Sequence, residues 1–172
     1  MRYFIDTEFN ERGPSKPIEL ISIGIVAEDG REYYAINASF NRRHATPWVK
    51  DNVLTKLPDR FVSFYDSPRI RDGALRWKPY ATVGAEVSRF IGHDPNPVFW
   101  GWCSGYDYVV LSQLIGFHRW PDGWPHYIRD IQQVIDESGR DVSEVESANS
   151  AHTAIEDARE IKRIWEYLAE KA

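Results

Sequence analysis

The sequence predicts an α/β protein in which helices flank a mixed β-sheet, and three observations lead to this prediction. Three strand-like segments follow one another closely, at 3–9, 18–26 and 32–40. From residue 80 onward, strand-like and helix-like segments alternate. Hairpin strands followed by such alternation are typical of a mixed sheet covered by helices. The 172 residues contain no repeat or composition break, so we expect one domain over 1–172.

The first three segments carry distinct strand signals. Residues 3–9 are rich in aromatic and β-branched side chains without alternation, which is typical of a central strand covered on both faces. Asp29 and Gly30 lie between the second and third segments and predict a tight hairpin turn. We therefore expect three antiparallel strands, and two further short strands at 97–102 and 126–129.

The helices are expected from apolar stripes and from capping residues. Thr46 followed by Pro47 is a favourable helix start, and Asp130 is another N-cap candidate. The expected helices span 48–54, 80–91, 106–116, 131–138 and 155–170.

A long connection at 58–78 is expected to lack regular structure, and it is rich in cations. Loops of this length in compact domains are often functional. The cations are typical of a solvated surface, and a phosphate clamp is the alternative. They are Arg60, Arg69, Arg71, Arg76 and Lys78.

Composition narrows the functional classes. A net charge of -5 argues against a nonspecific nucleic-acid coat protein, but it is compatible with an enzyme whose metal ions face a phosphodiester. The single cysteine, Cys103, leaves no intrachain disulfide and no Cys-rich zinc site. No apolar run is long enough to span a bilayer, and a strand starting at residue 2 leaves no room for a signal peptide. We therefore expect a cytoplasmic protein without a membrane partner.

Asp6 and Glu8 form a D-x-E pair within the first strand. Side chains alternate along a strand, so both carboxylates point to the same side. Two buried carboxylates repel each other and lose hydration, and a divalent cation between them is the simplest compensation. The alternative is that the strand has already emerged into solvent at Glu8.

Two further acids lie on apolar stripes of helices. Asp107 shares a face with Val110 and Leu111, although an acid at a helix start is also favoured by the macrodipole. Asp157 precedes Ile161 by one turn, whereas Glu160 and its charged neighbours are expected to face outward.

His152 lies in the loop five residues before Asp157. A loop histidine is usually a surface residue, but this one could act as a general base.

One shared site is the economical account of Asp6, Glu8, Asp107 and Asp157. Four oxygen ligands suit Mg²⁺ or Mn²⁺ rather than structural zinc. Two such ions about 4 Å apart would stabilise both oxygens of an in-line phosphoryl displacement.

These residues, in this order, resemble the DEDDh exonucleases of the ribonuclease H-like superfamily, to which ribonuclease T and oligoribonuclease belong. The resemblance rests on Asp6-Thr7-Glu8, on Tyr106-Asp107, and on His152 with Asp157. Residues 48–57 and 100–111 are most similar to an actinobacterial branch specific for polyadenylate 3' ends. One departure is that Trp102-Cys103 replaces the family's His-Asn, which questions how the strand exit there is held.

The resemblance implies a ribonuclease H-like fold with a central five-stranded mixed sheet in the order 3-2-1-4-5. It implies two Mg²⁺ or Mn²⁺ ions, with Asp6, Glu8 and Asp157 on the first and Asp6 and Asp107 on the second. His152 would take a proton from the attacking water. The partner would be an RNA 3' end, the product a nucleoside 5'-monophosphate, and the protein a homodimer.

Substrate contacts are expected from a second group of residues. Thr7 and Phe9 would face the terminal nucleotide, with Phe9 stacking on the base or lying in the core. Trp48 and Asn52 would cover the base or serve packing. Glu19 would bind a base amino group or cap a strand end.

Three other functions stay open on sequence alone. A DNA exonuclease differs only by the absence of a 2'-OH contact, which no motif reports. A second is a noncatalytic nucleic-acid-binding or protein-binding domain on this scaffold, against which the intact set of acids and His152 argues. A third is a structural cation-binding domain, which would leave His152 without a purpose.

Overall fold

The fold is described from a computed structural model, for residues 1–61, 72–92, 94–143, 145 and 152–170. The strands are β1 (Arg2–Asn10), β2 (Glu19–Ala27), β3 (Glu32–Asn37), β4 (Trp77–Lys78), β5 (Val98–Gly101) and β6 (Arg129–Asp130). The longer helices are α3 (Tyr80–Ile91), α4 (Gly105–Ile115), α5 (Ile131–Ser138) and α6 (Ala154–Ala169). The short helical turns are η1 (Arg42–His44), α1 (Pro47–Val49), η2 (Lys50–Leu54) and η3 (Phe117–Arg119).

The strands form one mixed sheet in the order β4-β3-β2-β1-β5-β6. The pairs β1–β2 and β2–β3 are antiparallel, and the other three pairs are parallel. The predicted α/β class and the predicted order of five strands are confirmed. The predicted strand count was wrong, because Trp77–Lys78 adds a sixth strand beside β3. Two residues are too few to show an alternating pattern, so the sequence predicts them to lie in the irregular connection at 58–78.

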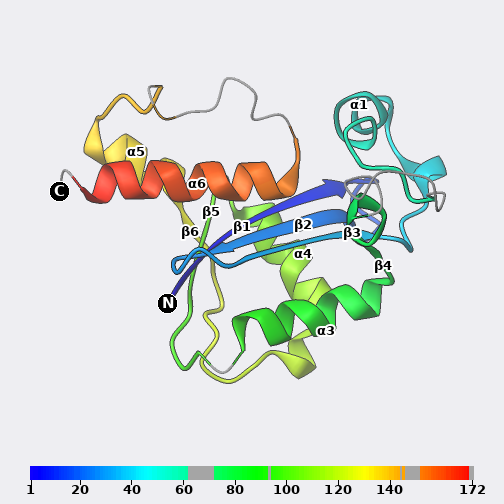
Figure 1. Cartoon of the computed structure of the whole chain (residues 1–172), viewed down its shortest axis with the longest axis horizontal. Helices are drawn as coiled ribbons and strands as arrows, with labels where there is room; N and C mark the ends of the chain where they lie inside the picture. The colour runs from blue at the N-terminus through cyan, green and yellow to red at the C-terminus, as the bar shows by residue number, and fades with distance from the viewer. Residues whose placement is uncertain (62–71, 93, 144, 146–151, 171–172) are drawn as a thin grey trace.

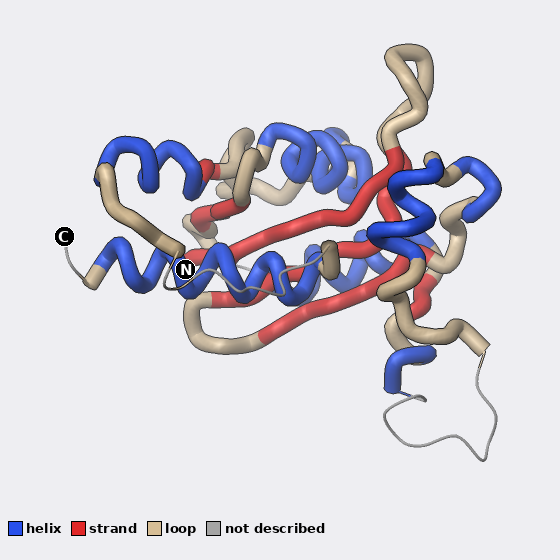
Figure 2. Tube along the Cα trace, turned by 90° about the horizontal axis from the view of Figure 1, so that it is seen from above, coloured by secondary structure: helices blue, strands red, loops and turns tan. Residues whose placement is uncertain are grey.

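Helices cover both faces of the sheet (Figures 1 and 2). Helices α3 and α4 lie on one face, over a core that includes Tyr3, Ile5 and Leu111. Helices α5 and α6 lie on the other face, where Phe4 and Ile161 belong to a second core cluster. Successive residues of β1 therefore serve opposite cores, as expected for a central strand.

A third, smaller cluster fixes the segment 42–54 at the end of the sheet. The pairing of β1 with β2 shifts register between Glu8 and Phe9, so that Ile21 is the extra residue of a β-bulge. Ile21 is fully buried against Val49, Val53 and other apolar residues of this segment. The segment begins as predicted, because the Thr46 side chain accepts a hydrogen bond from the Val49 backbone N–H. It then widens into a single π-helical turn, η2.

Among the described residues, no helix is both long enough and apolar enough to cross a membrane.

Candidate metal centre and active site

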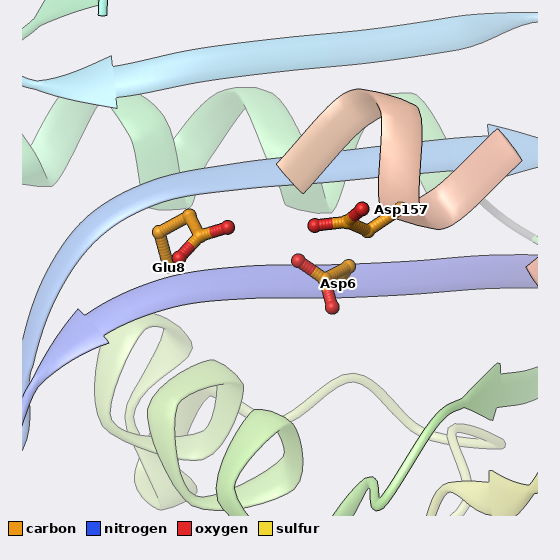
Figure 3. Close-up of side chains that lie close together, drawn as sticks. All are labelled: Asp6, Glu8 and Asp157. Atoms are coloured by element: carbon orange, nitrogen blue, oxygen red, sulfur yellow. The ribbon is translucent and has the colours of Figure 1, made fainter. Parts of the chain in front are cut away.

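Asp6 and Glu8 project from β1 toward the first turn of α6 (Figure 3). Glu8 is buried and Asp6 is half-buried, so the strand has not emerged into solvent at this point. Asp157 lies in the first turn of α6 and points back at both carboxylates (Figure 3). Oxygen atoms of these three side chains all lie within 4.8 Å of one another. Residues distant in sequence therefore form one acidic cluster.

Gly24 of β2 allows α6 to approach the sheet at this place. It pairs directly with Asp6 across the β1–β2 ladder. A Cβ on Gly24 would lie 2.2 Å from the backbone oxygen of Ala154, the first residue of α6. Only a residue without a side chain permits this contact, and the contact brings Asp157 close to the β1 acids.

The pKa values of the cluster are raised because its charges are buried together. Burial first, and then the charges of Asp107, Glu8 and Asp157, raise the pKa of Asp6 well above its ordinary range. Burial and Asp157 raise the pKa of Glu8 to about 8. Burial and Glu160 raise the pKa of Asp157 to about 6. Nearby positive charge does not offset this burial and repulsion, and the purely oxygen donors of the cluster fit Mg²⁺ or Mn²⁺.

Asp107 lies beside this cluster, attached to β1 from the opposite side. Asp107 is 4% exposed and lies in the first turn of α4. It therefore points inward, as predicted, and also occupies the helix start that favours an acid. Its Oδ1 accepts hydrogen bonds from the Thr7 backbone N–H at 2.9 Å and from the Thr7 hydroxyl at 2.6 Å. Burial raises the pKa of Asp107 to about 7 despite these two bonds. Asp107 also raises the pKa of Asp6 and of Glu8, which links it electrostatically to these two acids.

The strand exit before Asp107 is held by the Asp130 carboxylate, and Trp102 and Cys103, at the departure from the family pattern, both contribute hydrogen bonds there. The Asp130 carboxylate accepts hydrogen bonds from the backbone N–H groups of Cys103 at 3.0 Å and Ser104 at 2.8 Å. It also caps α5 through the Gln132 N–H. The Trp102 indole donates to the Gln132 side chain at 2.8 Å. One acid therefore fixes both the turn leading into α4 and the start of α5.

His152 borders the acidic cluster. It lines a pocket of ≈ 170 Å³ together with Asp6 and Asp157, and its ring contacts Trp48 edge-on at a centroid distance of 4.9 Å. Its backbone adopts a left-handed conformation with φ of 49°, which is uncommon for a non-glycine residue. Burial first, and then the Lys56 ammonium, lower the pKa of His152. The imidazole is therefore biased toward its neutral form, which can accept a proton.

The candidate substrate residues occupy different environments, and contact with RNA stays a prediction for each. Thr7 is buried and bonded to Asp107, so its hydroxyl positions that acid. Phe9 is half-buried and stacks on the exposed Tyr106 at 5.1 Å. Asn52 donates to the backbone oxygen of Trp48 at 2.9 Å, and Trp48 itself is 55% exposed.

Glu19 is engaged within the protein. Its carboxylate contacts the side chains of Arg12, His44 and the buried Asn10 at 3.0 to 3.2 Å. Hydrogen bonds from His44 and Asn10 outweigh the opposing effect of burial and lower its pKa. These contacts join the end of β1 to the segment 42–54.

The structure describes residues 58–61 and 72–78 of the cationic connection. Arg60 donates to the backbone oxygen of Ala38, and Lys78 pairs with Glu86. Arg76 lines a larger pocket of ≈ 620 Å³ beside the start of α6. The predictions for Arg69 and Arg71 lie outside the described residues.

Sequence reasoning missed two residues beside the acids. Lys56 lines the larger pocket and opposes the raised pKa values of Glu8 and Asp157. The only feature of the sequence that could have indicated Lys56 is its position just after the short predicted helix at 48–54. Glu160 was expected to face outward, and this was wrong because the residue is 4% exposed. Its spacing of one turn from Asp157 was the available signal, since residues three apart share a helix face.

Fold and site together define a class: a ribonuclease H-like α/β protein with an oxygen-ligand centre suited to divalent cations. Over 99% of this chain, the fold is similar to that of Pop2p from S. pombe in its Mg²⁺- and Mn²⁺-bound form. That match has a TM-score of 0.65 and 13% identity and covers 83% of the Pop2p chain. At this identity the likeness shows the fold alone.

A family model described as the 3'-5' exoribonuclease Rv2179c-like domain matches residues 63–169. The 3'-5' exoribonuclease Rv2179c of Mycobacterium tuberculosis H37Rv is 36% identical over 171 residues, covering 93% of this chain and 88% of that protein. The 3'-5' exoribonuclease MT2234.1 of M. tuberculosis CDC 1551 matches with the same figures. The chain therefore belongs to the Rv2179c-like 3'-5' exoribonuclease family, and it is an enzyme of that class.

Proposed function

We propose that this enzyme removes nucleotides one at a time from the 3' end of single-stranded RNA or a 3' overhang, releasing nucleoside 5'-monophosphates. The observation that carries this proposal is the convergence of Asp6, Glu8 and Asp157 within 4.8 Å, with Asp107 adjoining. Homology to 3'-5' exoribonucleases supports the polarity and the substrate class.

In this proposal the four acids bind two divalent cations between them. Asp6, Glu8 and Asp157 would hold one divalent cation, and Asp6 with Asp107 would hold a second, as in the DEDDh pattern. Two such cations supply charge stabilisation to the attacking and leaving oxygens of the scissile phosphate. Binding would also offset the burial that raises the pKa of all four acids, because a cation stabilises their charged forms.

His152 acts as the general base. Its position beside Asp6 and Asp157 lets the neutral ring take the proton of a water molecule that approaches the phosphate. The lowered pKa of His152 favours the neutral ring. Trp48 contacts the ring edge-on.

The chain end would be recognised near Phe9 and Trp48. Phe9 and the exposed Tyr106 form a stacked pair beside the acids on β1. Aromatic rings can stack on any base, so such a pair binds RNA with little dependence on the RNA sequence. Preference for polyadenylate, homodimer formation, a cytoplasmic location and a single domain over 1–172 complete the proposal, as the family resemblance implies.

The decisive experiment follows end-labelled RNA and matched DNA oligomers with Mn²⁺ or Mg²⁺, using wild type and Asp6→Asn. We expect a ladder shortening from the 3' end on RNA with wild type only. The exposed Glu137→Gln is a matched control and should cleave normally, because Glu137 lies on α5 away from the cluster. Equal turnover by Asp6→Asn would remove the site, and faster turnover of DNA would favour a DNA exonuclease.

A further inference from the structure

Glu160 is a buried carboxyl with one oxygen, Oε2, that accepts no hydrogen bond from the described residues. The side chain of Glu160 is 6% exposed. The nearest cation is Arg163, whose Nη2 lies 3.7 Å away, beyond hydrogen-bonding distance, on a side chain that is itself 45% exposed. A buried acceptor in this state is costly unless a donor reaches it from elsewhere.

The surroundings of Glu160 indicate where that donor comes from. Glu160 follows Asp157 by three residues on α6, so both side chains lie on the same helix face. It lines the ≈ 170 Å³ pocket with Asp6, Trp102, His152, Asp157 and Ile161. This volume accommodates several water molecules. Among the described residues, the lining contains no lysine or arginine.

Glu160 does not belong to the group of carboxylates that can grip one ion directly. That group, among the described residues, is Asp6, Glu8 and Asp157. A carboxyl one turn further along α6, facing the same water-sized space, is placed to act through water. Water molecules that complete the coordination of a bound cation are strong donors and need ordered acceptors.

We propose that Glu160 is a fifth acidic residue of the metal centre, a positioning residue that accepts hydrogen bonds from the water molecules completing the ion's coordination. It thereby strengthens cation binding and orders the water beside His152. The inference rests on the proposed function for the presence of the ion, and it adds a residue outside the four-acid pattern.

Calorimetric titration of the purified protein with Mn²⁺ tests this inference without RNA. Glu160→Gln should weaken Mn²⁺ binding about 10-fold, the lower end of what loss of such a supporting acceptor costs. Glu156→Gln is the matched control, because it removes the same charge from an exposed side chain beside Asp157, paired with Arg159. It should change the affinity less than about 2-fold, since exposed charges are well screened.

Thermal unfolding in EDTA separates this role from a structural one. Without metal, Glu160→Met should melt no lower than wild type, because the substitution removes an unsatisfied buried acceptor. With saturating Mn²⁺, its melting temperature should rise less than that of wild type.

Three results would overturn the inference. They are unchanged Mn²⁺ affinity in Glu160→Gln, equal weakening in Glu156→Gln, and a metal-free Glu160→Met that is clearly less stable than wild type. The last would assign Glu160 to its ion pair with Arg163. Failure of the proposed function is distinguishable, because a protein that binds Mn²⁺ in a Glu160-dependent manner but leaves RNA intact loses only the exonuclease proposal.

Discussion

Replacing Glu8 by glutamine should stabilise the metal-free protein at alkaline pH. The pKa of Glu8 is raised from an ordinary 4.5 to about 8 by burial and by Asp157. The folded state therefore holds this proton more tightly than the unfolded state does. It follows that stability falls as the pH rises from about 4.5 to about 8, which is the window between the two pKa values.

The expected size follows from the distance between those two pKa values. Each pH unit between them corresponds to about 1.4 kcal/mol, so full ionisation of Glu8 costs the fold about 5 kcal/mol. Glu8→Gln cannot ionise and escapes this cost. For a protein of this length the gain corresponds to a melting temperature about 10 °C above wild type near pH 9 in EDTA. Near pH 4 the two proteins should differ little.

The assay is thermal unfolding across this pH range, with and without Mn²⁺. Saturating Mn²⁺ should reverse the order, because the cation stabilises wild type by mass action and binds the variant poorly. The exposed Glu137→Gln should follow wild type at every pH. A stability difference between Glu8→Gln and wild type that does not change with pH would contradict this prediction, because the effect would then not arise from ionisation of Glu8.

Four further substitutions test the rest of the site. His152→Ala should lower kcat about 10²-fold with Mn²⁺ affinity retained by calorimetry, and an unchanged kcat would assign the proton transfer elsewhere. Lys56→Met should move the acid limb of the kcat–pH profile to higher pH, because the Lys56 ammonium helps to lower the pKa of His152 and its removal lets that pKa rise. A shift to lower pH would contradict this. Asp130→Ala should cost about 1 kcal/mol or more in urea unfolding through lost capping, and should lower kcat more than KM changes because the turn before Asp107 loosens; wild-type kinetics would show that this turn is held otherwise. Gly24→Ala should destabilise the protein by about 1–3 kcal/mol and weaken Mn²⁺ binding, since the new Cβ displaces the start of α6; unchanged metal affinity would separate helix placement from the site.

Sequence periodicity was sufficient for the elements that carry the acids. The alternation of β1 predicts that Asp6 and Glu8 share a side, and the apolar stripes of α4 and α6 predict that Asp107 and Asp157 point inward. These inferences succeed because burial and period are properties of a single element. Helix α3 spans the predicted 80–91 for the same reason.

The features that the sequence did not predict depend on contacts between elements, and the residue pattern of a single element does not indicate such contacts. Glu160 lies in a run of alternating charges that resembles a solvated face, yet it is buried where α6 crosses the sheet. Asp130 has the pattern of a simple N-cap, while its bonds to Cys103 and Ser104 form only after β5 and β6 pair. The strand at Trp77–Lys78 exists only because β3 offers a free edge.

The architecture of the site follows from β1 having two buried faces. On one face, Asp6 and Glu8 meet Asp157 where Gly24 admits α6. On the other face, the intervening Thr7 holds Asp107 at the start of α4. A strand exposed on one side could collect acids from only one layer. Covered strands normally exclude charge, so the retention of carboxyls with raised pKa values on both sides indicates a ligand that compensates them. Divalent cation binding as proposed would couple to fold stability through these four side chains, and metal removal should then loosen the start of α6 before it affects the α3–α4 face.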